Sequence, residues 1–106
     1  DAAPPDASDG ERAAQLLDSG RAAEAVPILR KQLDRVIAAN GEHNILTAGA
    51  LNNLGVALEK AGDLDGAIEM LERSLKIREG ISGPSDPMTL ALRERLAKLR
   101  AQRGHQ

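Results

Sequence analysis

The chain has no cysteine and no aromatic residue among its 106 residues. Without cysteine it offers no disulfides and no thiolate metal ligands, but this absence does not identify a compartment, because many exported and cytosolic proteins also lack cysteine. Without aromatic side chains the core must be built from Leu, Ile, Val, Met and Ala, and nucleic-acid bases or sugar rings find no ring on which to stack.

A large excess of charge and a long apolar run are also missing. The net charge of −2 gives no general attraction to nucleic acid or to anionic lipid. No apolar run approaches the roughly 20 residues that a membrane-spanning helix needs. We therefore expect a soluble protein without a membrane partner. The cytoplasm is slightly favoured while an exported form stays open, and the Ala-rich, Arg-over-Lys usage hints at a GC-rich bacterial gene.

The ends of the chain differ in composition from its middle. The first residue is Asp1 rather than Met, which indicates a processed chain or a piece of a longer protein. Residues 1–8, DAAPPDAS, hold a proline pair, two acidic residues and small side chains, so we expect a disordered linker or tail there. One folded domain is expected at residues 9–104, followed by a tail at 105–106.

Residues 48–75 read as two antiparallel helices joined at a glycine. Apolar residues recur at helical spacing on both sides of Gly62: Leu51, Leu54, Leu58 and Ala61 before it, and Leu64, Ala67, Ile68, Leu71 and Leu75 after it. Gly62 suits the left-handed position just past a helix end, and Asp63 can cap the next helix. The small residues Gly55 and Ala67 would let the two backbones come close.

This hairpin is repeated with a period of 42 residues. The shift superposes Gly20 on Gly62 and Gly104, Ala25 on Ala67, Leu29 on Leu71, Leu33 on Leu75, Gly41 on Gly83, Thr47 on Thr89, and Leu54 on Leu96. Seven coincidences at one offset point to a repeat rather than to chance. We therefore expect an all-α fold of about two and a half helix hairpins.

The period and the capping signals predict five helices, roughly at residues 9–19, 21–39, 44–61, 63–79 and 86–103. Asp86 precedes Pro87 as a helix cap precedes proline at the first helical position, and Asn44 takes the equivalent place one repeat earlier. Pro27 falls inside the second helix, where it predicts either a kink or a later helix start. The sequence leaves both open.

Residues 51–90 resemble tetratricopeptide repeats of the 42-residue kinesin-light-chain type. The residues that carry the resemblance are Leu54, Gly55, Leu58, Gly62, Ala67, Leu71 and Leu75. Between repeats the family usually shows Gly, two residues, His-Pro and a nearby Thr. This chain runs from Gly83 to Thr89 with Asp86 in place of the His, whereas the earlier copy keeps His43 and has Ile45 in place of the Pro. The resemblance implies a short right-handed superhelix, and it is specific for the fold rather than for the function.

Charged side chains at the last helix indicate where the array is closed. Arg93 and Arg100 stand where the central hairpin has Leu51 and Leu58, so a face that is covered in the middle becomes solvated at the end. The last helix keeps leucines for packing backwards and is expected to be a capping helix: Leu92, Leu96 and Leu99. The first helix mirrors this with polar side chains outward, and we expect a complete small domain.

Function is expected from a surface. By resemblance, the first helix of each repeat lines a concave groove that takes an extended peptide or a helix of a partner. The expected partner-binding residues are Asn52, Asn53, Val56, Lys60, Arg95 and Lys98. Asn53 can satisfy both an N–H and a C=O of a bound backbone, while Arg95 and Lys98 can receive an acidic side chain or a terminal carboxylate. The alternative for each is a solvated helix face.

Catalysis and nucleic-acid binding find little support. The five basic residues between 93 and 103 come with a single Glu94 and no aromatics, so an acidic protein partner is favoured over nucleic acid. His43 lacks converging partners, and Asp63 and Asp65 lack the remaining ligands of a calcium loop. We expect no enzyme activity, no metal and no cofactor. A second hypothesis is a structural one, in which the chain self-associates as a homodimer.

Overall fold

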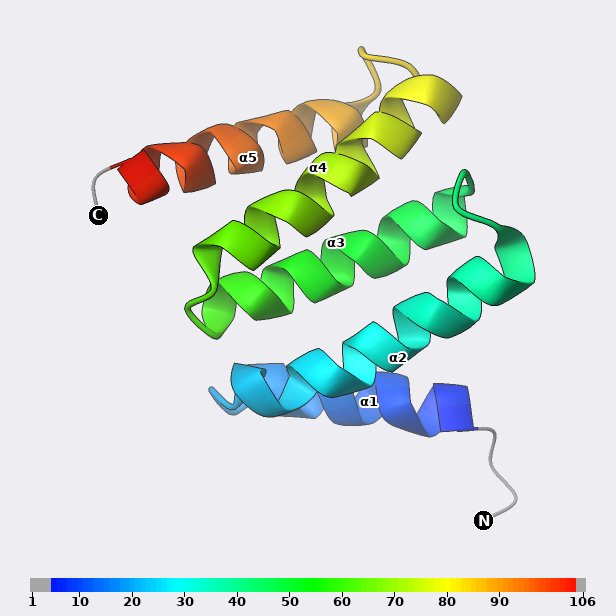
Figure 1. The fold of residues 1–106 in the computed structure, drawn as a ribbon, viewed down its shortest axis with the longest axis vertical. Coiled ribbons are helices and arrows are strands. Elements are labelled where there is room, and N and C mark those ends of the chain that lie inside the picture. Colours follow the sequence, from blue (N-terminus) through cyan, green and yellow to red (C-terminus); the bar gives the residue numbers. More distant parts are fainter. Residues whose placement is uncertain (1–4, 105–106) are drawn as a thin grey trace.

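The computed structural model describes the backbone of residues 5–104 and the side chains of residues 9–104. Five helices run back and forth and stack in chain order, with α1 and α5 at opposite ends (Figure 1). They are α1 (Pro5–Asp18), α2 (Ala22–Asn40), α3 (Ile45–Lys60), α4 (Leu64–Ile81) and α5 (Pro87–Gly104). Residues 5–104 contain no strand, so the predicted all-α class is confirmed.

α1 begins earlier than predicted. It starts at Pro5, four residues before the expected start at Asp9, so residues 5–8 are helical rather than part of a disordered linker. Proline suits a first helical position because the N–H that it lacks would have no partner there. The expectations for residues 1–4 and for the tail at 105–106 lie outside the described residues.

Helix starts and turns follow the predicted signals. Asn44 Oδ1 accepts from the Leu46 amide at 2.8 Å, Asp63 Oδ1 from the Gly66 amide at 2.9 Å, and Asp86 Oδ2 from the Met88 amide at 3.0 Å. The four glycines with positive φ sit between helices and form two pairs 42 residues apart: Gly20 with Gly62, and Gly41 with Gly83. The later start at Pro27 is wrong, because α2 begins at Ala22 and runs through the proline.

The hairpin of α3 and α4 is packed closely around a glycine. A Cβ atom added at Gly55 would lie 2.8 Å from Leu71 Cγ, which is closer than non-bonded carbon atoms approach each other. The Ser74 hydroxyl, which is fully buried, donates to the Ala48 carbonyl at 2.8 Å and ties the two helices together. The predicted close approach of these helices is therefore confirmed.

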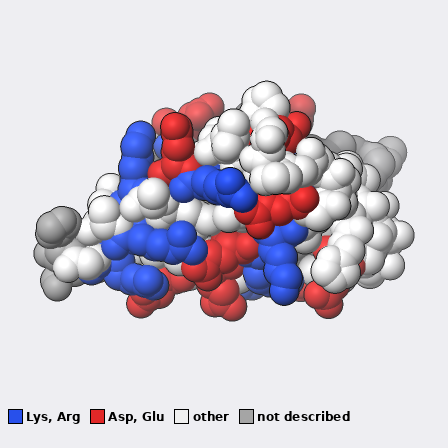
Figure 2. Space-filling model, turned by 90° about the horizontal axis from the view of Figure 1, so that it is seen from above, with Lys and Arg blue, Asp and Glu red and all other residues white. Residues whose placement is uncertain are grey.

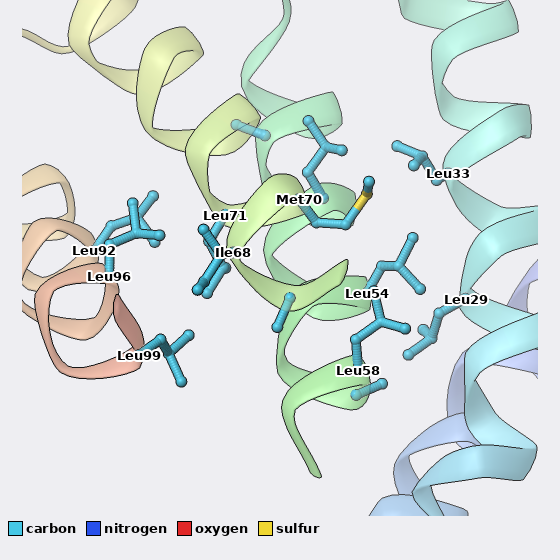
Figure 3. Packing of buried hydrophobic residues seen from close by; sticks show 14 of the residues in the cluster. Leu29, Leu33, Leu54, Leu58, Ile68, Met70, Leu71, Leu92, Leu96 and Leu99 are labelled. Carbon is cyan, nitrogen blue, oxygen red and sulfur yellow. The ribbon is translucent and has the colours of Figure 1, made fainter. Parts of the chain in front are cut away.

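The core runs along the array because each helix packs mainly on its neighbours in the chain. Leu29 and Leu33 of α2 face Leu54 and Leu58 of α3 (Figure 3). Towards the C-terminal end of the stack, three leucines of α5 face Ile68 and Leu71 of α4 (Figure 3): Leu92, Leu96 and Leu99. α2 therefore lies between α1 and α3, and α4 lies between α3 and α5 (Figure 1).

The outward side of α5 is charged, as predicted. Leu51 is completely buried and Leu58 is buried, whereas Arg93 and Arg100 are exposed. Both arginines reach back to α4 and form ion pairs there, with a third pair from Arg103. Blue and red side chains accordingly alternate over this end of the molecule (Figure 2). The charged face is thus paired with α4 rather than merely solvated.

Candidate functional site

Three hollows lie between α1, α3 and α5, and they are lined mainly by these three helices. The first lies between α1 and α3, and we call it the α1–α3 hollow. The second holds Arg78 and Arg95 and is called the two-arginine hollow. The third is called the Glu59 hollow. All three are open to solvent rather than enclosed.

The α1–α3 hollow has a volume of about 250 Å³ and an apolar wall with two amide side chains. α1 contributes Leu17 and three small residues, and Leu29 contributes from α2. The amides come from Gln32 on α2 and Asn53 on α3. Such a hollow can take an apolar side chain while an amide holds the adjoining peptide backbone.

The two-arginine hollow, with a volume of about 280 Å³, joins cations to an apolar wall. Its polar side chains are Asn52 from α3, Arg78 from α4 and Arg95 from α5. Met88, which is 58% exposed, stands at the same hollow near the start of α5. A carboxylate placed here can accept from guanidinium and amide donors together.

The Glu59 hollow, with a volume of about 190 Å³, is lined almost entirely by α5. Arg95 and Lys98 stand beside Glu94, and α3 adds Glu59. Arg95 Nη1 lies 3.7 Å from Glu59 Oε1, which is an ion pair but too long for a hydrogen bond. That carboxylate oxygen is buried and has no hydrogen-bond partner among the described residues.

Five of the six predicted binding residues line these hollows. Asn53 and Val56 both line the α1–α3 hollow, and Asn52 and Arg95 both line the two-arginine hollow. Arg95 also meets Lys98 at the Glu59 hollow. The exception, Lys60, is exposed in the last turn of α3 and lines none of the three. Their binding role stays a prediction.

Sequence reasoning did not single out Met88, Arg78 and Gln32. Met88 stands seven positions before Arg95 on the same stripe of α5, so helical periodicity contained a signal for it. Arg78 and Gln32 come from α4 and α2, the second helices of their hairpins. The family resemblance pointed only to first helices, so neither residue carried a signal.

The other candidate sites do not assemble. Asp63 caps α4 and Asp65 pairs with Arg103, which accounts for both members of the supposed calcium loop. Among the side chains that the structure describes, no group of three His, Cys, Asp or Glu residues could hold a metal ion. Within residues 5–104, no helix has both the length and the apolar character needed to cross a membrane.

The comparison with known families agrees with the fold. A tetratricopeptide-repeat family model matches residues 7–80 and again residues 46–106. The chain belongs to the tetratricopeptide-repeat family. A search among curated proteins finds no match. Tetratricopeptide repeats generally mediate protein–protein interactions and are typically non-enzymatic, whereas the kinesin-light-chain type stays a prediction for this chain.

Proposed function

We propose that this tetratricopeptide-repeat protein binds an extended peptide, or an extended segment of a partner protein, across the hollows between α1, α3 and α5. The observation that carries the proposal is the position of α3 between two hollows. Its Asn53 and Val56 line the α1 side, and its Asn52 lines the α5 side. One bound segment can therefore contact all three odd-numbered helices.

The two sides of α3 suit different parts of such a segment. The α1–α3 hollow presents apolar side chains and amides, which favour an apolar side chain and the backbone next to it. The α5 side holds Arg78, Arg95 and Lys98 against Glu59 and Glu94, an excess of positive charge. A neutral or acidic partner segment fits this distribution better than a basic one.

Structural self-association as a homodimer is the second candidate function, and the exposure of two apolar side chains favours it. Leu46 and Met88 are 59% and 58% exposed, and they occupy the same position in successive repeats. Each therefore presents an exposed apolar side chain to a second copy, Leu46 near the start of α3 and Met88 near the start of α5. Light scattering with refractive-index detection separates a dimer from a monomer, and it does not need the absorbance at 280 nm that this chain lacks.

The direct test is selection of displayed dodecapeptides on the immobilised protein. Selected peptides are then measured against the triple variant Asn52→Ala, Asn53→Ala, Arg95→Glu by fluorescence anisotropy. The matched control is Lys31→Glu, which introduces the same acidic residue on α2 outside the three hollows. Circular dichroism must show the same helix content for all three proteins.

We expect peptides that bind the wild type and the control alike and that lose at least tenfold in affinity for the triple variant. Peptides that bind the triple variant as tightly as the wild type would contradict groove binding. Failure to select any peptide, combined with a dimer in light scattering, would favour the structural alternative.

A further inference from the structure

Ala91 and Arg95 line both hollows on the α5 side of α3, and Arg95 is the charged one of the two. On one side it meets Asn52 and Arg78, and on the other it meets Glu59. Arginine has a long and flexible side chain, so small changes in its torsion angles move the guanidinium between neighbouring places. The position of this guanidinium decides which hollow is the more positive.

The Glu59 carboxylate holds Arg95 only loosely. The distance of 3.7 Å is longer than that of the other ion pairs described here, such as Arg100 to Glu72 at 2.5 Å and Arg103 to Asp65 at 3.3 Å. Glu59 Oε1 is nevertheless buried, so it has given up water without gaining a hydrogen bond. A charged acceptor in this state is poorly satisfied, and the pair contributes little to stability.

Arg78 and Arg95 repel each other when the two-arginine hollow is empty, because both guanidinium groups are positive. Glu59 offsets this repulsion by attracting Arg95 towards the Glu59 hollow. A carboxylate placed between the two arginines would reverse the preference, since it attracts both and accepts hydrogen bonds from them. Glu59 and such a carboxylate therefore require the same guanidinium.

We propose that Arg95 takes up an acidic side chain of the bound segment and that Glu59 competes with this side chain for the Arg95 guanidinium. The inference rests on the proposed function, and it adds the chemistry of the partner and a residue that sets specificity. Glu59 is a positioning residue that acts through Arg95. When the bound segment has no acidic side chain, Arg95 keeps its ion pair with Glu59. Only an acidic segment therefore binds in the two-arginine hollow through Arg95.

The test compares two variants that each remove one negative charge. Glu59→Gln removes the competitor, and Glu69→Gln, at an exposed position of α4 that lines none of the three hollows, is the matched control. Affinity is measured by fluorescence anisotropy for the three tightest peptides from the selection described above. Each peptide is also measured in a form in which every Asp and Glu is replaced by Asn and Gln.

Glu59→Gln should tighten the binding of the acidic peptides by about two- to fivefold, the range expected for releasing a partly exposed ion pair. The amide forms should bind both proteins equally, which a purely structural role for Glu59 would not produce. Glu69→Gln should change affinity by less than about twofold, because its effect acts only through screened charge. When Arg95 is already replaced by Gln, the further change Glu59→Gln should not alter the affinity for the acidic peptides.

Three results would overturn the inference while leaving groove binding in place. The first is selected peptides that carry no acidic residue. The second is weaker binding by Glu59→Gln, which would mean that Glu59 contacts the peptide itself. The third is an equal gain in affinity for Glu59→Gln and Glu69→Gln, which would reduce the effect to net charge. Loss of groove binding as such is reported separately by the triple variant.

Discussion

The α3–α4 hairpin and the α4–α5 contact hold helices together in different ways. Between α3 and α4 the contact is buried and close, with Gly55 against Leu71 and the Ser74 hydroxyl bonded to the Ala48 carbonyl. At the edge of α5, Arg93 and Arg100 take the repeat positions of the buried Leu51 and Leu58 and form ion pairs with α4. The repeat thus replaces apolar burial by exposed charge at its last helix, where nothing further covers it among residues 5–104.

The two turns between repeats show a second difference of this kind. The Thr47 hydroxyl donates to the Gly41 carbonyl at 2.6 Å. Thr89 occupies the same repeat position and is also fully buried, yet its hydroxyl oxygen has no hydrogen-bond partner among the described residues. The repeat therefore preserves residue identity here but not the hydrogen bond. Both differences predict that α5 is held in the fold less tightly than α3.

The largest expected effect compares Leu51 with Arg93, one repeat later. Leu51→Ala removes a completely buried side chain and should lower the free energy of unfolding by about 2–5 kcal/mol. Arg93→Ala removes an exposed ion pair with Glu79 and should cost less than about 1 kcal/mol. Urea unfolding followed by circular dichroism measures both. Similar losses for the two variants would show that the positions are not as different as their burial indicates.

The next effect concerns the three ion pairs between α5 and α4. Replacing Arg93, Arg100 and Arg103 together by Gln should destabilise α5 by about 1–2 kcal/mol, since each exposed pair contributes up to about 1 kcal/mol. Amide hydrogen exchange resolved by peptide measures the opening of α5 against that of α3.

Salt provides the control for these pairs. Raising the salt concentration from about 0.05 to about 0.5 M should speed exchange in α5 of the wild type, because salt screens exposed charges. It should have little effect on α5 of the triple Gln variant. Exchange that responds to salt equally in α3 and α5 would refute the role of the ion pairs.

The sequence predicted the parts of this fold that repeat or that depend on neighbouring residues. The 42-residue period placed Leu54 and Leu96 in the core, and the caps at Asn44 and Asp86 depend on the next two or three residues only. The hairpin around Gly62 followed from the same local rules. Elements with strong local signals were therefore placed within a few residues.

Contacts between distant residues were beyond the sequence. The pair of Arg100 and Glu72 joins residues 28 positions apart, and it depends on how α5 lies against α4. Arg78 enters the two-arginine hollow for the same reason, because the tilt of α4 decides where its side chain reaches. Periodicity gives the face of a helix but not its tilt against the next one. Apart from Lys60, the predicted residues of α3 and α5 therefore line hollows, but the sequence did not indicate that Arg78 and Gln32 line them too, and the binding role of all of these residues stays a prediction.

A smaller effect separates the two threonines. Thr47→Val should lower the free energy of unfolding by about 1 kcal/mol, because the Gly41 carbonyl loses a donor. Thr89→Val should be neutral or stabilising, because it removes a buried hydroxyl that makes no hydrogen bond among the described residues. Thermal unfolding of both variants in the same buffer measures the difference. Equal destabilisation would mean that the Thr89 hydroxyl is satisfied in solution.

The smallest effect lies at the start of α2. Side-chain hydrogen bonds from Arg21 at 2.7 Å lower the pKa of Glu24 below its ordinary value of 4.5. A carboxyl with a lowered pKa stabilises the fold above its unfolded pKa, and this contribution is lost as the pH falls through the folded value. Glu24→Gln should therefore melt slightly lower than the wild type at pH 7 and at the same temperature well below pH 4.5. A difference that is constant across this range would contradict the assignment.

The most direct test of groove binding is a titration of the isotope-labelled protein with a selected dodecapeptide, followed residue by residue in NMR spectra. The account predicts that the largest shift changes fall on residues lining the three hollows, with Asn52, Asn53 and Arg95 among them. Changes confined to the outward sides of α2 and α4, or to Leu46 at the exposed start of α3, would contradict it.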